Sequence, residues 1–87
     1  MKLADAGTLL RIWAENVELT ARDIREVFGC SLAQASKLKS KVVAEQLKRE
    51  IPFISPHSCN TEVAYEVWGI SIDSLKKRAT TLKKIGA

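Results

Sequence analysis

The sequence has little of what metal proteins, secreted proteins and membrane proteins usually carry. It contains one histidine and two cysteines, and the cysteines, Cys30 and Cys59, form no Cys-x-x-Cys pair. Neither a disulfide framework nor a zinc ribbon is therefore indicated, and we expect reduced, buried cysteines in a cytoplasmic protein. No apolar run exceeds three residues, which argues against a membrane-spanning helix and against the apolar segment of a signal peptide.

Patterns typical of catalysis are also missing. The single histidine, His57, lies among serines and prolines and has no evident partner for a Ser/His/Asp or Cys/His arrangement. We find no paired carboxylates and no glycine-rich loop that would cradle a phosphate. His57 with Cys59 and Cys30 supplies only three of the four ligands that a structural zinc ion takes. The sequence therefore predicts no enzyme, no cofactor and no metal ion.

Basic residues are concentrated in the second part of the chain. The 87 residues fit one soluble domain, with 46% apolar residues, 28% charged residues and a net charge of +4. Residues 1–36 carry a net charge of −1, whereas residues 37–87 carry +5. Two clusters hold most of the positive charge: Lys37, Lys39, Lys41, Lys48 and Arg49, then Lys76, Lys77, Arg78, Lys83 and Lys84. An anionic partner would explain this balance, and so would solvated helix faces.

A seven-residue pattern occurs twice, forty residues apart. Residues 26–32 read Glu-Val-Phe-Gly-Cys-Ser-Leu, and residues 66–72 read Glu-Val-Trp-Gly-Ile-Ser-Ile. In each copy the glycine ends one helix and the serine caps the next. The aromatic residues before the glycines, Phe28 and Trp68, are expected in the core.

Caps and apolar spacing predict five helices. The first runs from about Leu3 or Thr8 to Val17, with Leu9, Leu10, Trp13 and Val17 on its apolar side. The next two begin at caps Thr20 and Ser31, with Asp23 and Gln34 at the spacing of capping boxes. The third continues to about Glu50, before Pro52 and Pro56, and its apolar positions are Leu32, Ala35, Leu38, Val42, Val43 and Leu47.

The last two helices follow a connecting loop. Residues 51–59 form this loop, with a short extended stretch possible at Phe53 and Ile54. Asn60 caps the fourth helix, whose face is Val63, Ala64, Val67 and Trp68. Ser71 caps the fifth, whose stripe is Ile72, Leu75, Ala79 and Leu82, ending near Ile85. The sequence predicts one all-α domain over residues 1–87, with helical hairpins at about 20–50 and 60–84 and an internal repeat at 20–45 and 60–85.

A short helix, a Gly-apolar-Ser turn and a longer helix resemble the helix-turn-helix family of DNA-binding proteins. The stretch from Val67 to Arg78 is similar to the turn and recognition helix of small bacterial and phage regulators. Two residues depart from the pattern. Arg78 stands where an apolar residue is usual, so Ala79 must substitute. Arg25 stands where a small residue is preferred, which predicts looser or altered packing. A fainter resemblance, in layout and size, is to excisionase-like proteins of phages and conjugative elements.

The resemblance implies that the start of the second helix in a unit meets base edges in the major groove. In the second unit the residues concerned are Ser71, Asp73, Ser74, Lys76, Lys77 and Arg78. In the first unit they are Ser31, Ala33, Gln34, Ser36, Lys37 and Lys41. Gln34 would pair with adenine and the lysines would contact phosphates. For Ser31 and Ser71 we favour helix capping over base contact. The basic triplet 76–78 favours the second unit as the reader.

Two functions of different classes therefore remain open. The first is sequence-specific binding of double-stranded DNA, as a small transcription regulator or a recombination accessory factor of a phage or mobile element. Its partners would be DNA and, in addition, a recombinase or a second copy of the chain. The alternative is a helical protein–protein module, such as a phage structural or adaptor protein. DNA binding calls for a contiguous positive face at Lys37, Lys41, Lys76 and Lys77, and the alternative calls for an exposed apolar groove.

Overall fold

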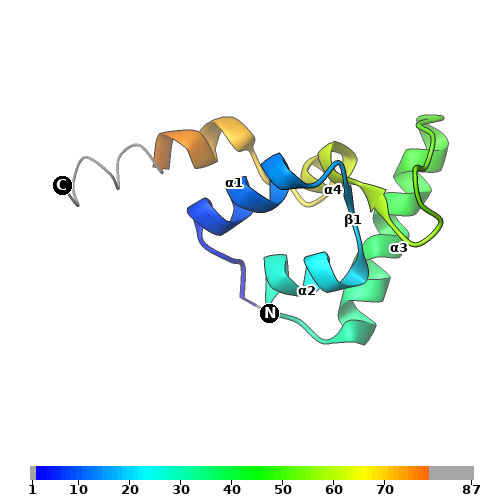
Figure 1. Ribbon diagram of the computed structural model, residues 1–87, viewed down its shortest axis with the longest axis horizontal. Helices are drawn as coiled ribbons and strands as arrows, with labels where there is room; N and C mark the ends of the chain where they lie inside the picture. The colour runs from blue at the N-terminus through cyan, green and yellow to red at the C-terminus, as the bar shows by residue number, and fades with distance from the viewer. Residues whose placement is uncertain (1, 79–87) are drawn as a thin grey trace.

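Helices make up most of the structure, a computed structural model in which residues 2–78 are described. They are α1 (Ala6–Glu15), α2 (Ala21–Phe28), α3 (Leu32–Lys48), α4 (Thr61–Val67) and a last helical segment at 72–78. The expected all-α class with five helices is confirmed for these residues (Figure 1). Four residues assigned to the last helix or to the second basic cluster lie outside the described part: Ala79, Leu82, Lys83 and Lys84.

Side-chain caps begin the helices, as the sequence predicts. The Thr20 hydroxyl accepts a hydrogen bond from the Asp23 backbone N–H at 3.4 Å, and the Asp23 carboxylate accepts from the Thr20 N–H at 2.8 Å. Asn60 caps α4 by accepting from the Val63 N–H at 3.0 Å. For α1 the sequence left the start open, and the structure places it after Asp5, which accepts from the Thr8 N–H at 2.7 Å.

Left-handed residues end three of the helices. Gly29 has φ 55° and Gly69 has φ 72°, and both glycines act as the helix stops predicted for them. The third stop was not predicted: α3 ends at Lys48, and Glu50 takes φ 57° before Pro52 is reached. A local turn rather than proline therefore closes α3.

A two-stranded sheet joins the two parts of the chain, and the sequence did not predict it. β1 (Glu18–Leu19) pairs with β2 (Cys59–Asn60) in antiparallel register. The extended stretch expected at Phe53 and Ile54 is wrong, since the strand comes six residues later. Two-residue strands give too short an alternation of apolar and polar residues to be seen in a sequence.

The core lies where α1, α2, α3 and α4 meet. Its most buried apolar side chains are Leu9, Ile12, Leu19, Ile24, Val27, Ala35, Val42, Cys59, Val63, Ala64 and Tyr65. Tyr65 also donates its hydroxyl to the Leu9 carbonyl at 2.6 Å, so its polar group is satisfied inside. Both cysteines are free and buried, as expected, and burial raises the pKa of Cys59 to about 11.

Four apolar residues assigned to buried faces are exposed instead. Val17 is 70% exposed because α1 ends at Glu15 and the chain has left the helix by then. Leu32 and Leu47, 58% and 63% exposed, lie in the first and last turns of α3, where neighbouring elements no longer cover it. Val67 is 38% exposed at the end of α4. The spacing of apolar residues correctly predicts which side of each helix faces the core. It does not predict how much of the length of each helix is covered by neighbouring elements.

Gln46 is the one polar side chain with no exposed surface among the described residues, and it fixes the loop after α3. Its Nε2 donates to the carbonyls of Ile51 at 3.4 Å and Pro52 at 3.2 Å. Its Oε1 accepts from the Asn60 N–H at 2.8 Å. The buried amide thus connects the end of α3 with the strand β2.

Candidate nucleic-acid interface

The first helix-turn-helix unit consists of α2, the turn at residues 29–31 and α3. Ile24 and Ala35 have no exposed surface, and Cys30 in the turn is only 9% exposed. These buried apolar residues pack α2 and α3 against each other on either side of the turn. A Cβ on Gly29 would lie 3.2 Å from the Lys2 carbonyl oxygen, so the turn is also tightly enclosed by the N-terminal segment.

One face of α3 is exposed along its first half. We call it the reading face, and it consists of Ala33, Ser36, Lys37, Ser40 and Lys41. Their spacing of three and four residues places them on one side of the helix, opposite the buried Ala35 and Val42. The structure thus brings Ser36, Lys37 and Lys41 together as expected. Ser40, which the sequence did not single out, completes the stripe.

Gln34 is not available for the bidentate adenine contact assigned to it. Its Oε1 accepts from the Ser31 N–H at 3.1 Å, and the Ser31 hydroxyl accepts from the Gln34 N–H at 3.2 Å. Pairing with adenine uses the amide oxygen and nitrogen together. The capping box already uses that oxygen, so Gln34 and Ser31 serve as helix caps.

Two members of the first basic cluster, Arg49 and Lys39, form contacts within the protein. Arg49 forms ion pairs with Glu45 at 2.9 Å and with Glu66 of α4, and these two carboxylates raise the pKa of its guanidinium, Glu66 having the larger effect. Lys39 donates to the His57 carbonyl at 3.3 Å. Arg49 and Lys39 therefore stabilise the fold, and the reading face keeps Lys37 and Lys41.

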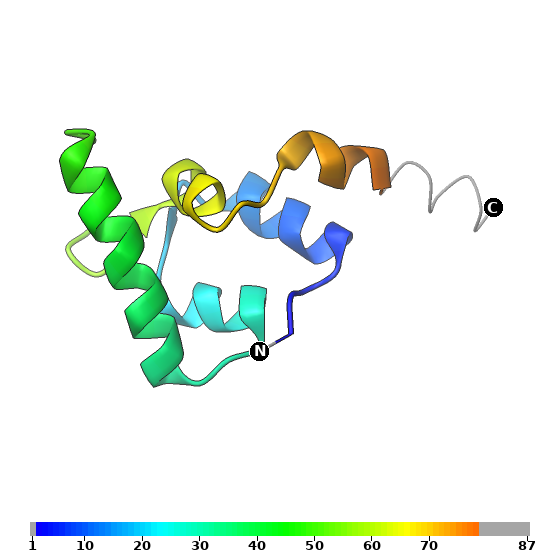
Figure 2. The same cartoon turned by 180° about the vertical axis from the view of Figure 1, so that it is seen from behind.

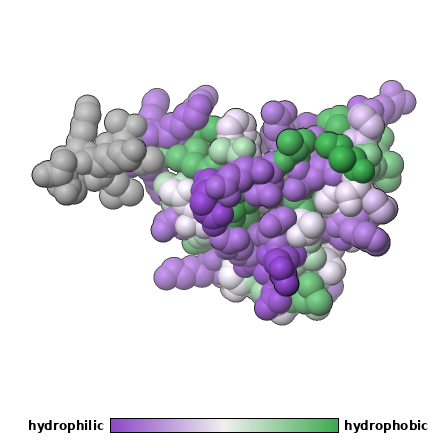
Figure 3. Space-filling model, viewed as in Figure 1, coloured by the Kyte–Doolittle hydropathy of each residue, from purple (hydrophilic) through white to green (hydrophobic). Residues whose placement is uncertain are grey.

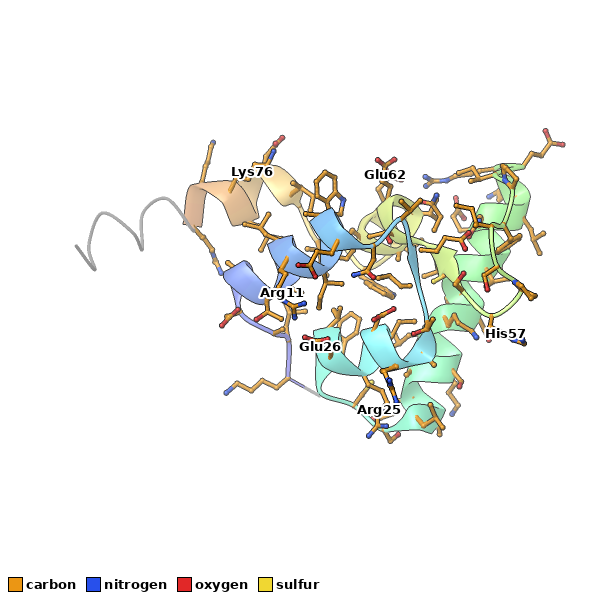
Figure 4. All side chains as sticks on the ribbon, viewed as in Figure 1. Arg11, Arg25, Glu26, His57, Glu62 and Lys76 are labelled. Atoms are coloured by element: carbon orange, nitrogen blue, oxygen red, sulfur yellow. The ribbon has the colours of Figure 1, made fainter. Side chains whose placement is uncertain are left out.

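Two arginines on α2 extend the positive surface, although the sequence assigned neither to a site. Arg22 and Arg25 line a shallow hollow of about 420 Å³ beside the turn. Arg25 is exposed, at the bottom of the molecule in Figure 4, and its Nε donates to the Cys30 carbonyl at 3.3 Å. Of the looser or altered packing predicted from Arg25, the structure shows an altered arrangement, in which the side chain lies outside the helix pair and bridges the turn.

The second unit consists of α4, the turn around Gly69 and the segment 72–78. Ser71 caps that segment by accepting from the Ser74 N–H at 3.3 Å, and Leu75 is buried beneath it. The other residues predicted to meet DNA are exposed here: Asp73, Ser74, Lys76, Lys77 and Arg78. Ala79, expected to replace the missing apolar residue at Arg78, lies outside the described residues.

The two units meet at their equivalent aromatic residues and point away from each other. The rings of Phe28 and Trp68 pack edge to face, with centroids 5.0 Å apart. Figures 1 and 2 place α3 at one end of the long axis and segment 72–78 at the other, in a molecule 43 Å long. Lys37 and Lys41 therefore form no contiguous face with Lys76 and Lys77.

Other kinds of site find no support in the described part of the chain. Within residues 2–78, no three or more His, Cys, Asp and Glu side chains are grouped as metal ligands would be. His57 is exposed, whereas Cys59 and Cys30 are buried. No helix in the same range combines the length and the apolar composition needed to cross a membrane.

No family model, curated protein or solved structure matches this chain.

Proposed function

We propose that the protein binds double-stranded DNA and that the reading face of α3 enters the major groove. The observation that carries the proposal is the exposed stripe of small side chains and lysines on a helix held firmly against α2. Ala33 and Ser36 are small enough to let the helix approach the base edges. Lys37 and Lys41 supply charge for the backbone phosphates on either side.

The first unit is preferred over the second on geometric grounds. Its two helices carry a capping box each, and its turn is closed by Cys30 and by the Arg25 hydrogen bond. Arg22 and Arg25 place further positive charge next to the start of α3. The basic triplet at 76–78 lies at the far end of the molecule, so the two units do not meet one stretch of groove together.

The biological role that follows is that of a small regulator of transcription or an accessory factor in recombination. A protein of this size binds a short site, and a phage or mobile element is the setting that the excisionase-like layout suggests. Both roles need the same activity, which is recognition of a duplex by a helix in the major groove.

Fluorescence anisotropy with a labelled random duplex, at about 50 mM and about 200 mM salt, tests the proposal. We expect micromolar binding that falls steeply with salt. Lys37→Ala should weaken binding to every duplex and reduce the salt slope by about one unit. Lys48→Ala is the matched control, because Lys48 is exposed on the same helix about 16 Å further along.

The Lys77→Ala variant shows which of the two units binds the duplex. If Lys77→Ala lowers the salt slope and Lys37→Ala does not, the second unit is the reader. If the unmodified protein binds no duplex at the lower salt, the lysines are solvated faces, and the protein–protein module becomes the better interpretation.

A further inference from the structure

The helix assigned to the major groove begins with two exposed apolar side chains. Leu32, the first residue of α3, is 58% exposed, and Ala33 next to it is exposed as well. Figure 3 shows apolar atoms at the bottom of the molecule, where Figure 1 places the start of α3. In a helix-turn-helix this end of the second helix is the part that meets base edges.

Several polar groups near this end of α3 already have partners within the protein. The Ser31 hydroxyl and the Gln34 amide oxygen accept hydrogen bonds in the capping box. The Ser40 hydroxyl donates to the Ser36 carbonyl at 3.0 Å, so its proton is used within the helix. These three side chains therefore have less capacity to form hydrogen bonds with a base.

The reading face also lacks the side chains that recognise two of the four bases. Adenine is usually recognised by a carboxamide and cytosine by a carboxylate. The reading face consists of alanine, serine and lysine, so it carries neither group. Its lysines are donors only and fit the O6 and N7 acceptors of guanine or the phosphates.

The apolar side chains at the start of α3 match one group in the major groove. That group is the C5 methyl of thymine, the apolar group that a base pair presents there. Lys37 and Lys41 follow about one and two helical turns further along, where they can hold the phosphates while Leu32 and Ala33 face the bases.

We propose that Leu32 and Ala33 pack against thymine C5 methyl groups, so that the protein prefers duplexes with thymine where the start of α3 lies. This inference rests on the proposed function and adds to it the kind of base that is recognised. The discrimination comes from apolar contact, whereas the affinity shared by all duplexes comes from the lysines.

Two labelled duplexes of equal length test the preference. One consists of alternating adenine and thymine, and in the other deoxyuridine replaces every thymine. The two duplexes carry the same phosphates and the same hydrogen-bonding groups, and they differ in the C5 methyl. By fluorescence anisotropy at about 50 mM salt, both should bind. The thymine duplex should bind about fourfold more tightly for each methyl group that the contact buries.

Leu32→Ala should lower this ratio to less than about twofold, because most of the apolar contact is removed. The salt slope should stay unchanged, since the substitution removes no charge. Leu47→Ala is the matched control. Leu47 is 63% exposed on the same helix, about 22 Å further along, and this variant should keep the full ratio.

Two results overturn the thymine preference: equal affinity of the unmodified protein for the two duplexes, or a Leu32→Ala variant that keeps the full ratio. In both cases the protein still binds DNA, so the proposed function stands. Binding to neither duplex at this salt contradicts the proposed function, and the thymine preference fails with it.

Discussion

Gly29 and Gly69 have the same left-handed backbone but different surroundings. A Cβ at Gly29 would approach the Lys2 carbonyl oxygen to 3.2 Å, whereas a Cβ at Gly69 meets nothing within 4 Å. Any L-residue at either position is strained by its positive φ. Only at Gly29 must the neighbouring backbone move as well, and that backbone donates from Lys2 to the Phe28 carbonyl at 2.8 Å.

Alanine substitutions should separate these two effects. Gly69→Ala should lower the free energy of unfolding by about 1 kcal/mol, the usual effect of φ alone. Gly29→Ala should lower it further, because steric contact adds to the strain. Chemical denaturation of both variants gives the comparison. Equal losses would mean that the N-terminal segment yields to the Cβ without resistance.

One carboxylate, that of Glu18, accepts hydrogen bonds from three residues of the loop at 51–58. Partial burial raises the pKa of Glu18, but hydrogen bonds from Ile54, Ser58 and Ser55 outweigh it, and the net pKa is lowered below its usual range. A carboxylate with a lowered pKa in the folded state stabilises the fold above its unfolded pKa of about 4.3. The stabilisation is lost as the pH falls through the folded pKa.

The free energy of unfolding should therefore decrease as the pH falls from about 5 to about 3, and part of that decrease belongs to Glu18. Glu18→Gln should be less stable at neutral pH and should show a weaker pH dependence in this range. Urea denaturation at several pH values measures both. If the two proteins show the same pH dependence, the decrease comes from other carboxylates. Asp5 is one of them, because the hydrogen bond that it accepts from the Thr8 N–H also lowers its pKa.

Elements that depend on neighbouring residues could be predicted from the sequence, and elements that depend on distant residues could not. The caps at Thr20, Ser31 and Asn60 and the stops at Gly29 and Gly69 are local hydrogen-bond and backbone effects, and all five are confirmed. The strand pair, the Glu18 contacts and the hydrogen bond from Asn60 to the buried Gln46 join residues fourteen to forty-two positions apart. No local pattern reveals which polar side chain will find such partners.

The candidate site shows the same division. Ser36, Lys37 and Lys41 were placed on one face because helical spacing fixes that face. The adenine contact predicted for Gln34 competes with its role as a cap, because one side chain fits two roles, and only the geometry shows that the cap uses its amide oxygen. The sequence places Arg49 in a basic cluster, and only the structure shows that its guanidinium pairs with Glu66.

An aromatic contact is one of the links between the two units. Phe28 and Trp68 stand at equivalent positions of the repeated pattern, and their rings touch edge to face at 5.0 Å between centroids. The Tyr65 ring also packs against the indole of Trp68, with the ring centroids 6.1 Å apart. The two units therefore share a core, although their last helices lie at opposite ends.

A double-mutant cycle on Phe28→Leu and Trp68→Leu should give a coupling energy of about 0.5–1.5 kcal/mol. Each single variant should still unfold in one transition, because both units contribute to one core. Circular dichroism and tryptophan fluorescence during urea denaturation provide two independent probes. Coupling near zero, or two separate transitions, would show that the units fold independently of each other.

The three attachments of residues 51–58 have a consequence for how this chain tolerates changes in length. Surface loops usually accept insertions and deletions. Here Gln46 fixes the start of the loop, Glu18 fixes its middle, and β2 fixes its end. This loop is also the covalent connection between the two units. An added or deleted residue would move at least one of these attachments away from its partner, so homologues that keep all three should vary in sequence here but not in length.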